Sequence, residues 1–384
     1  MFVIIREAQK KLLDLASKFK CVAVTGARQC GKTTLVKQTF VDLPYVSLEN
    51  FDTRQFALDD PRGFLQSYPN GAIFDEIQRT PNLFSYLQEF LDNTREKGRY
   101  ILTGSNNFLL QQSITQSLAG RVGFLTLLPF SLKELKSLNA LPTSDLTLMK
   151  NGFYPPIYDQ GIPPNDWCPN YIRTYIERDV RQVKNITDLI VFERFIKILA
   201  GRTAQEFNAS SLALEIGVDV KTIQSWVGIL ENSYIIYLLK PHHKNYNKTI
   251  VKRPKVYFYD TAIVCSLIGI QTEDQLDLNP SKGAIFENMV INEFVKNRTN
   301  IGADINLYYW RDKTGHEIDL IIDNSPDILP IEIKSGKTVN SEFFKNLIYW
   351  MKLSYNKKAQ LLYGGTQFQQ HSSGIEVKNW RNLN

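Results

Sequence analysis

One segment near the beginning of the chain combines glycines, a lysine and a hydroxyl side chain at the spacing of a phosphate-binding loop. Residues 26–33 fit the pattern GxxxxGK[ST], between an apolar run at 21–24 and a helical pattern. Such a loop directs backbone N–H groups at a polyphosphate, its lysine reaches the β- and γ-phosphates, and its hydroxyl binds Mg²⁺. We therefore predict an ATP site, with Thr33 also a metal ligand. The residues expected to contact the nucleotide are Gly26, Ala27, Arg28, Gln29, Cys30, Gly31, Lys32, Thr33 and Thr34.

Two carboxylates directly follow a second apolar run, residues 71–74. Phosphoryl transfer needs one acidic residue near Mg²⁺ and another that orients or deprotonates the attacking water. We assign Asp75 to the metal and Glu76 to the water. An Asp-Glu pair after a strand is common in proteins, so this assignment depends on the phosphate loop that precedes it.

Two further positions are candidates for the same site. The apolar run 100–103 ends in polar residues, and either Ser105 or Asn106 would sense the γ-phosphate; the alternative is an ordinary turn at the end of a strand. Arg121 follows a helical stretch and precedes another apolar run. It either completes the positive charge at an ATP site, in its own chain or in a neighbouring one, or is a surface arginine.

Acidic and basic side chains occur together again in the last third of the chain. Asp319 begins the second strand of a predicted hairpin, Glu332 and Lys334 share a face of the next strand, and Glu317 is assigned to the turn. Asp319 and Glu332 would hold Mg²⁺, with Glu287 from the preceding helix as a further ligand. Lys334 would activate water for attack on a phosphodiester. This spacing resembles that of the restriction-endonuclease-like fold; the alternative is a salt-bridged core in an inactive fold.

The middle of the chain has the pattern of a winged helix. Helices at 210–216 and 219–230 match helix-turn-helix spacing, and strands at 234–239 and 255–259 would close a wing. In a DNA-binding version the second helix enters the major groove and the wing contacts phosphates. A surface for a protein partner is the alternative. The candidate DNA contacts are Lys221, Thr222, Gln224, Ser225, Lys244, Lys248, Lys252 and Arg253.

The elements that must position these residues change character along the chain. Up to about residue 130, short apolar runs alternate with amphipathic helical stretches, which predicts a parallel α/β sheet. The middle third is mainly helical, and the last third alternates again between helix and strand. We therefore predict an α/β protein with four segments: a P-loop ATPase domain with a parallel sheet (1–138), a linker and helical region (139–188), the winged helix (189–262) and a restriction-endonuclease-like α/β domain (263–384).

The ATPase motifs carry a resemblance to a known family. The chain resembles the prokaryotic AAA-type ATPases that have a C-terminal domain of unknown function, and the resemblance covers nearly the whole chain. It implies ATP binding, ATP hydrolysis and a homo-oligomer in which Arg121 faces a site, but it does not supply a substrate. The matching segments are 26–34 (GARQCGKTT), 74–78 (FDEIQ), 102–106 (LTGSN), 117–122 (SLAGRV), 175–180 (YIERDV) and 332–334 (EIK).

The composition excludes several classes of protein. The 384 residues include 45 Lys+Arg and 39 Asp+Glu, a net charge of +6, and 43% are hydrophobic, which is typical of a folded chain of two or three domains. No uncharged apolar run approaches the roughly 18 residues that a membrane span needs. The four cysteines form no CxxC pair, which argues against a zinc site. We expect a cytoplasmic protein without a membrane segment, whose modest positive charge permits DNA binding.

Together these patterns predict an ATPase that uses ATP and Mg²⁺ and acts on double-stranded DNA, with Mg²⁺-dependent phosphodiester cleavage at the C-terminal residues. The alternative is an ATP-regulated switch that binds a protein or DNA and carries an inactive nuclease-like domain. Substitution of Lys32 and of Lys334 distinguishes the two hypotheses, because only the first requires both residues for chemistry.

Overall fold

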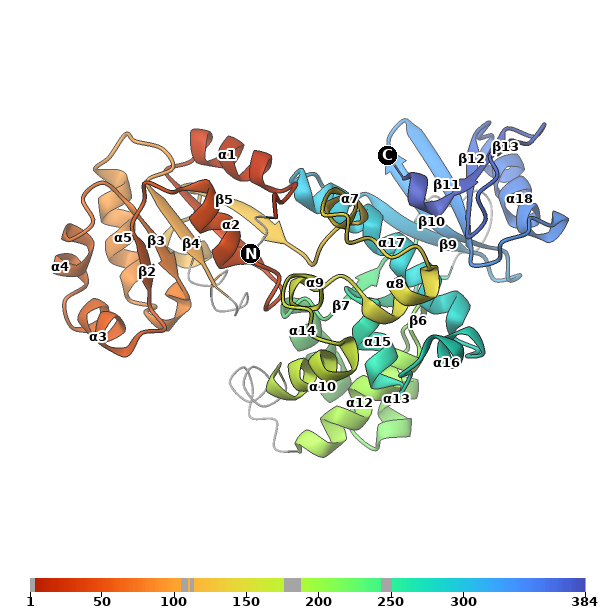
Figure 1. Cartoon of the computed structure of the whole chain (residues 1–384), viewed down its shortest axis with the longest axis horizontal. Coiled ribbons are helices and arrows are strands. Elements are labelled where there is room, and N and C mark those ends of the chain that lie inside the picture. Colours follow the sequence, from red (N-terminus) through yellow and green to blue (C-terminus); the bar gives the residue numbers. More distant parts are fainter. Residues whose placement is uncertain (1–3, 105–109, 111–113, 176–187, 243–250, 384) are drawn as a thin grey trace.

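The computed structural model describes residues 4–104, 110, 114–175, 188–242 and 251–383. The molecule is elongated, with one sheet at each end and a mainly helical region between them (Figure 1). None of the helices in the described ranges is long and apolar enough to span a membrane.

The N-terminal unit is built on a five-stranded sheet in which every strand runs parallel to its neighbours. The strands are β1 (Cys21–Gly26), β2 (Tyr45–Ser47), β3 (Ala72–Asp75), β4 (Tyr100–Thr103) and β5 (Val122–Leu127). Their order in the sheet is β2-β3-β4-β1-β5. β1, β3 and β4 are buried throughout, which explains their continuous apolar sequence. The sheet confirms the predicted parallel α/β class.

Helices cover this sheet and one of them follows the phosphate loop directly. They are α1 (Gln9–Lys18), α2 (Lys32–Thr39), α3 (Phe51–Asp59), α4 (Pro61–Gln66) and α5 (Leu83–Asp92). β1 ends at Gly26, whose φ is 133°, and a Cβ at this residue would lie 1.9 Å from the carbonyl oxygen of Leu127. Only glycine therefore allows β1 and β5 to approach so closely where the loop begins.

The middle of the chain is helical, as predicted. Its first part contains α7 (Leu132–Ser137), α8 (Asp145–Asn151), α9 (Pro155–Asp159), α10 (Pro164–Tyr175) and α12 (Leu189–Gly201). Its last part contains α15 (Thr261–Leu267) and α16 (Glu273–Asp277). α7 begins with a capping box formed by Ser131 and Glu134, which fixes the first turn of a helix only six residues long.

Between these helices lie the elements predicted for the helix-turn-helix and the hairpin. They are α13 (Ala209–Ile216), α14 (Val220–Asn232), β6 (Gln205–Glu206), β7 (Ile236–Leu239) and β8 (Lys255–Phe258). The predicted N-cap Asp219 accepts a hydrogen bond of 2.8 Å from the backbone N–H of Thr222. β7 and β8 pair antiparallel, and β6 adds a short third strand beside β8.

The C-terminal unit is a six-stranded mixed sheet between two helices. The helices are α17 (Lys282–Asn300) and α18 (Lys345–Ser354), and the strands are β9 (Leu307–Arg311), β10 (Glu317–Asn324), β11 (Asp327–Lys334), β12 (Ala359–Tyr363), β13 (Gln369–Gln370) and β14 (Ile375–Asn379). β9, β10 and β11 form an antiparallel meander, whereas β11, β12 and β14 run parallel. Ile331 and Ile333 of β11 share a core with α17, and Leu361 of β12 packs with α18. β10 begins at Glu317, two residues before the predicted start.

One hydrophobic core runs through all three regions. It joins Val22 of β1 to Phe195 of α12 and to Ile331 of β11. α17 also contacts β5, α8 and α15. The C-terminal unit is therefore packed against both the N-terminal unit and the middle region. The boundaries at 138, 188 and 262 remain predictions, because this shared core crosses each of them.

Candidate functional site

The phosphate loop lies where β1 gives way to α2. Lys32, the first residue of α2, is buried, and its Nζ donates hydrogen bonds to the carbonyl oxygens of Gly26 (3.0 Å) and Ala27 (2.7 Å). Gly31 precedes it in the left-handed conformation, with a φ of 93°. The backbone therefore curls around the lysine, with the helix N-terminus pointing into the loop.

Asp75, the last residue of β3, accepts hydrogen bonds from three hydroxyl groups. Thr33 Oγ1 lies 3.1 Å and the Tyr45 hydroxyl 2.6 Å from its Oδ2, and the Thr103 hydroxyl donates to its Oδ1. Burial and the neighbouring Asp75 carboxylate raise the pKa of Tyr45. Within the described residues Asp75 has no cationic partner. Thr33 and Asp75 are thus adjacent hard oxygens, the donor type that Mg²⁺ prefers.

Glu76 follows Asp75 at the carboxyl end of β3. Its backbone is left-handed, with φ 57° and ψ 38°, and the side-chain amide of Gln78 donates to its carboxylate. The turn thus redirects the chain at once, so that Asp75 and Glu76 face different surroundings. Ser105 and Asn106, predicted to sense the γ-phosphate, lie outside the described residues.

Arg121 lies at the opposite edge of the sheet from the phosphate loop. β5 starts at Val122 and runs parallel to β1, with Val122 beside Cys21 and Leu127 beside Gly26. Five residues of strand, about 17 Å, therefore separate Arg121 from its own loop. The guanidinium instead binds both oxygens of Asp92, at 2.6 Å and 3.0 Å. The structure does not support the predicted role in its own chain's site; a role at a neighbouring chain's site stays a prediction.

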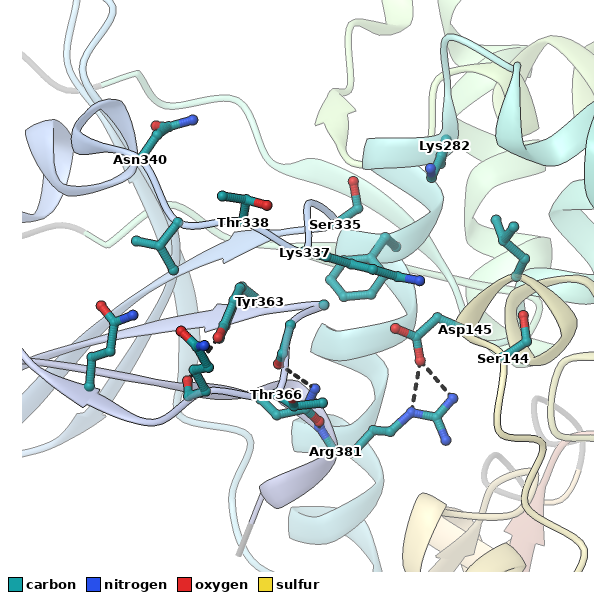
Figure 2. A pocket seen from close by; sticks show the side chains of 18 of the residues that line it. Ser144, Asp145, Lys282, Ser335, Lys337, Thr338, Asn340, Tyr363, Thr366 and Arg381 are labelled. Carbon is teal, nitrogen blue, oxygen red and sulfur yellow. Dashed lines mark hydrogen bonds and ion pairs between the residues drawn. The ribbon is translucent and has the colours of Figure 1, made fainter.

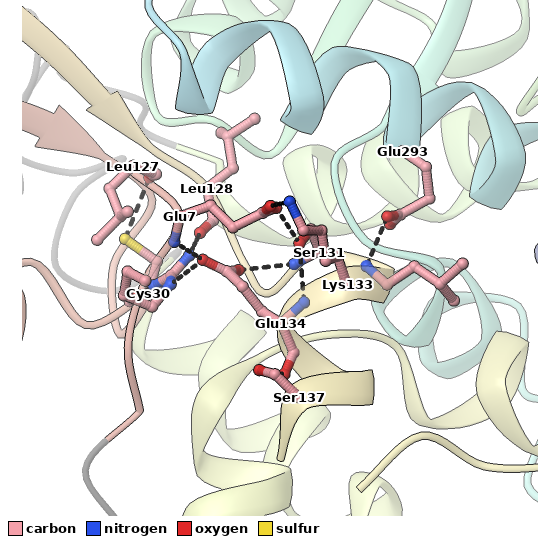
Figure 3. Close-up of polar contacts among 11 residues, drawn as sticks. Glu7, Cys30, Leu127, Leu128, Ser131, Lys133, Glu134, Ser137 and Glu293 are labelled. Carbon is pink, nitrogen blue, oxygen red and sulfur yellow. Dashed lines mark hydrogen bonds and ion pairs between the residues drawn. The ribbon is translucent and has the colours of Figure 1, made fainter. Parts of the chain in front are cut away.

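A buried arginine, Arg6, hydrogen-bonds to the backbone of the phosphate loop. Arg6 donates to the carbonyl oxygens of Cys30 (2.6 Å) and Leu128 (2.7 Å) and to the carboxylate of Glu134 (2.8 Å). Glu134 caps α7, and the first backbone N–H of α7 donates to Glu293 of α17 at 2.6 Å (Figure 3). A continuous set of buried polar contacts thus leads from the loop to the C-terminal unit.

The middle region contacts the same loop from another side. Trp167 of α10 donates from its indole N–H to the side-chain oxygen of Gln29 at 2.9 Å, and its ring stacks on Tyr171. The hydroxyl of Tyr234 lies 3.4 Å from that of Thr25 in β1. These contacts connect the loop and β1 to α10 and to the turn before β7, which follow them by more than a hundred residues.

The predicted C-terminal residues Asp319, Glu332 and Lys334 converge. Lys334 Nζ lies 2.6 Å from Glu332 Oε1 and 3.7 Å from Asp319 Oδ2, and Asp319 accepts the backbone N–H of Ile333 at 2.8 Å. Glu332 is 4% exposed, and its Oε2 has no hydrogen-bond partner among the described residues. The arrangement leaves one buried carboxylate oxygen facing the cluster without compensation.

A second lysine, which the sequence analysis missed, enters the cluster from the hairpin of the middle region. Lys255 of β8 is buried; its Nζ lies 3.2 Å from Glu287 Oε1 and forms an ion pair with Glu317. Tyr257, on the same face of β8, donates to Glu287 at 2.5 Å. The assignment of Glu317 to a turn was wrong, because the residue begins β10 and binds this lysine.

The carboxyl groups of this cluster crowd one another in a buried setting. Burial and the neighbouring Asp319 raise the pKa of Glu332 to about 8, against the effect of Lys334. Burial also raises the pKa of Glu287; Lys255 opposes that shift and Asp319 adds to it. Throughout the described ranges, no three His, Cys, Asp or Glu side chains are grouped so as to hold a metal ion.

Three family models match successive parts of the chain. Residues 18–136 match an AAA domain, residues 146–274 a domain of unknown function (DUF8612), and residues 282–383 another domain of unknown function (DUF4143). The chain thus contains an AAA domain followed by two domains of unknown function. The AAA match covers the parallel sheet, the phosphate loop and Asp75, and it supports ATP binding at that loop.

Similar proteins span most of this AAA-domain protein. An uncharacterized protein of Mycobacterium tuberculosis is 29% identical over 337 residues, covering 87% of this chain and 74% of the relative. An uncharacterized protein of Haemophilus influenzae is 23% identical over 389 residues, covering 92% of this chain and 91% of the relative. Among solved structures, the Walker-type ATPase of Pyrococcus abyssi has a TM-score of 0.46 at 14% identity and covers 68% of this chain and 94% of its own. AMPPCP-bound DnaA from Aquifex aeolicus has a TM-score of 0.31 at 14% identity and covers 58% of this chain and 85% of its own.

The AAA-domain protein exposes part of the predicted DNA-contact set. Lys221 and Gln224 are exposed on α14, and Lys252 and Arg253 are exposed directly before β8. The hydroxyl of Thr222 already donates a hydrogen bond to Asp219 at 2.7 Å within the protein. Ser225 is half-buried, and Lys244 and Lys248 lie outside the described residues.

Proposed function

We propose that this AAA-domain protein binds and hydrolyses ATP with Mg²⁺ at the phosphate loop. The observation that carries the proposal is the 3.1 Å contact between the Thr33 hydroxyl and Asp75, directly beside the buried Lys32. The pattern of residues 26–33 and the parallel sheet bring these groups to one carboxyl edge. Mg²⁺, when bound, neutralises phosphate charge and supplies the Lewis acidity that the reaction needs.

Each residue of the site has a separate task in this proposal. Lys32 exchanges its two carbonyl partners for the β- and γ-phosphates, since an ammonium gains more from phosphate oxygens than from neutral carbonyls. Thr33 and Asp75 hold the metal, and Glu76 orients the attacking water or takes its proton. Arg6 keeps the carbonyl of Cys30 turned away from the phosphates, which leaves the loop's N–H groups facing them.

ATP turnover in Lys32→Ala tests this proposal. We expect hydrolysis to fall at least about 100-fold, the scale of removing one preorganised charge-stabilising group. Lys18→Ala is the control, because Lys18 is an exposed partner of Asp14 on α1 and lies outside the loop. Equal turnover in wild type and Lys32→Ala contradicts the proposal.

We further propose that the C-terminal cluster cleaves phosphodiesters with Mg²⁺ in double-stranded DNA. The supporting observation is the convergence of Asp319, Glu332 and Lys334, with Glu332 Oε2 buried and unpaired. In this role Asp319 and Glu332 would hold the metal and Lys334 would position water. The predicted third ligand, Glu287, instead binds Lys255 and Tyr257. The competing proposal is that Lys255 and Lys334 neutralise the cluster permanently, so that the protein is an ATP-regulated switch with an inactive nuclease-like domain.

Plasmid cleavage separates these two proposals. Nuclease activity in wild type that disappears in Lys334→Ala, while ATP turnover persists, supports the first. ATP turnover without cleavage in any divalent metal supports the second. Because both activities are measured in one preparation, loss of folding would show as loss of both.

In this proposal, α14 and the segment before β8 belong to a winged helix and contact DNA. The support is the exposure of Lys221, Gln224, Lys252 and Arg253. Phosphate contacts predict retention on duplex DNA that weakens as salt rises and that falls in Lys221→Glu. No retention at low salt favours a protein partner instead.

The proposal includes a homo-oligomer in which Arg121 completes a neighbouring chain's ATP site. Its place at the amino edge of the sheet, far from its own loop, suits action across an interface. Mixing Arg121→Ala with Lys32→Ala should then restore part of the turnover, because each variant supplies what the other lacks. No recovery on mixing excludes this role.

A further inference from the structure

A pocket of about 1100 Å³ lies at the carboxyl edge of the C-terminal sheet. The parallel strands β11, β12 and β14 all end there, contributing Ser335, Tyr363 and Asn379 to its lining. α8 and the start of α17 face these strand ends across the pocket (Figure 2). Ligands of open α/β sheets bind outside the carboxyl ends of the strands, so the position itself favours a binding site.

Several polar side chains in this carboxyl-edge pocket have no partner. The side chains of Ser335, Lys337 and Thr338, from the loop after β11, and of Thr366, after β12, make no hydrogen bond or ion pair within the described residues. Lys337 extends across the pocket toward Lys282 and Asp145 (Figure 2). The pocket therefore presents hydroxyl groups and one exposed ammonium group that make no hydrogen bond to another described residue.

The acidic groups of the pocket, in contrast, are already paired. Asp145 binds Arg381 at 2.6 Å, and Asp277 binds Lys282 at 2.5 Å. Lys337 is thus a positive charge that neither of these carboxylates neutralises, and the net charge of the lining is positive. A ligand that uses Lys337 together with neighbouring hydroxyl groups must bring negative charge and several acceptor oxygens.

We propose that the carboxyl-edge pocket binds a terminal phosphate group, carried by a free nucleotide or by the end of a nucleic-acid strand. A phosphate monoester supplies both the negative charge and the acceptors, and about 1100 Å³ is large enough to admit a nucleotide. Because α8 and α17 stand opposite the strand ends, the pocket suits a terminal group better than a continuous strand. Ser335 follows Lys334 in the sequence, but Asp319, Glu332 and Lys334 do not line the pocket, so it is a site separate from their cluster. The proposal does not depend on ATP hydrolysis.

The test compares two hexathymidylates that differ only in a 5′-phosphate, by fluorescence anisotropy. The full chain carries Lys32→Ala, so that the phosphate loop does not contribute to binding. We expect the phosphorylated strand to bind at least about tenfold more tightly. Lys337→Glu should remove this difference. Lys358→Glu is the matched control, because Lys358 is also exposed but precedes β12, at the opposite edge of the sheet.

Competition with AMP distinguishes the two sources of the phosphate. Displacement of the strand by AMP at a comparable concentration indicates a free nucleotide, and displacement only at a large excess indicates a strand end. Three results overturn the proposal: equal binding of the two strands, binding of neither, or equal weakening by Lys337→Glu and Lys358→Glu.

Discussion

The two candidate catalytic regions gather similar residues but balance their charges differently. In the AAA domain, Asp75 is surrounded by hydroxyl donors and Lys32 is bonded to neutral carbonyls, so neither charge has an ionic partner among the described residues. In the C-terminal cluster, Lys255 pairs with Glu287 and Lys334 with Glu332. The AAA site therefore still requires a cation and an anion, whereas the cluster largely supplies its own counter-ions.

The two regions also differ in what holds their side chains in position, the backbone in one and ion pairs in the other. The AAA residues are held by a loop and by strand ends, so their geometry does not depend on mutual attraction. The cluster residues come from β8, α17, β10 and β11, and their ion pairs connect the middle region to the C-terminal domain. Removing a charge should therefore affect binding in the AAA domain and folding in the cluster.

The largest expected effect is on stability, in Lys255→Met. This change leaves the half-buried carboxylate of Glu287 without its cation, whereas Glu317 keeps Arg311 at 3.3 Å. The free energy of unfolding should therefore fall by about 3 kcal/mol, the lower end for a broken buried pair. Chemical denaturation measures it. The double variant Lys255→Met/Glu287→Gln should recover part of the loss, because it removes the unpaired charge. A single variant as stable as wild type would show that the cluster does not need this lysine.

The next effect is on nucleotide binding, in Asp75→Asn. The amide still hydrogen-bonds to Thr33 and Tyr45 but cannot neutralise Mg²⁺, so affinity for ATP with Mg²⁺ should fall about 100-fold while stability changes little. Titration of ATP with Mg²⁺ and with EDTA gives the comparison, since the variant should lose only the metal-dependent part. An unchanged metal dependence argues against Asp75 as a ligand.

The third prediction concerns pH and Glu332. Its pKa is raised from the ordinary 4.5 to about 8, so between these values the folded state holds a proton that the unfolded state releases. Stability must then fall as pH rises from 5 to 8. In Glu332→Gln this fall should be shallower, by at most about 1.4 kcal/mol per pH unit. Denaturation curves at several pH values test it, and identical slopes would mean that Glu332 titrates normally.

The smallest expected effect is that of Tyr45→Phe. The change removes one hydrogen bond to Asp75 and keeps the ring over which Lys37 lies. We expect a loss of about 1 kcal/mol, or roughly fivefold, in affinity for ATP with Mg²⁺. Tyr68→Phe is the control, since Tyr68 is a tyrosine of the same domain that makes no contact with Asp75. Equal affinities in the two variants would remove Tyr45 from the site.

The sequence predicted those features whose determinants are close together along the chain. The phosphate loop, the strand ending in Asp75 and the hairpin before Glu332 each depend on a local pattern, and all are present. Arg6 and Lys255 were missed because their partners, Glu134 and Glu287, are 128 and 32 residues away and no local pattern links them. A lone arginine or lysine in a sequence gives no sign of burial.

The distance of Arg121 from its own phosphate loop is a different case, because strand pairing alone determines it. Arg121 precedes a strand that is parallel to β1, and the phosphate loop follows β1, so the two must lie at opposite edges of the sheet. Only the strand pairing was needed for that conclusion. The approach of α17 and β8 to one another, in contrast, follows from packing of the shared core.

ATP binding and turnover by Glu76→Gln test the central claim most directly. If the AAA site hydrolyses ATP as proposed, the variant should bind ATP with Mg²⁺ as wild type does, because Thr33, Asp75 and Lys32 are intact, and should lose turnover because water is no longer activated. Wild-type turnover in Glu76→Gln, or no turnover in wild type with Mg²⁺, would contradict the account.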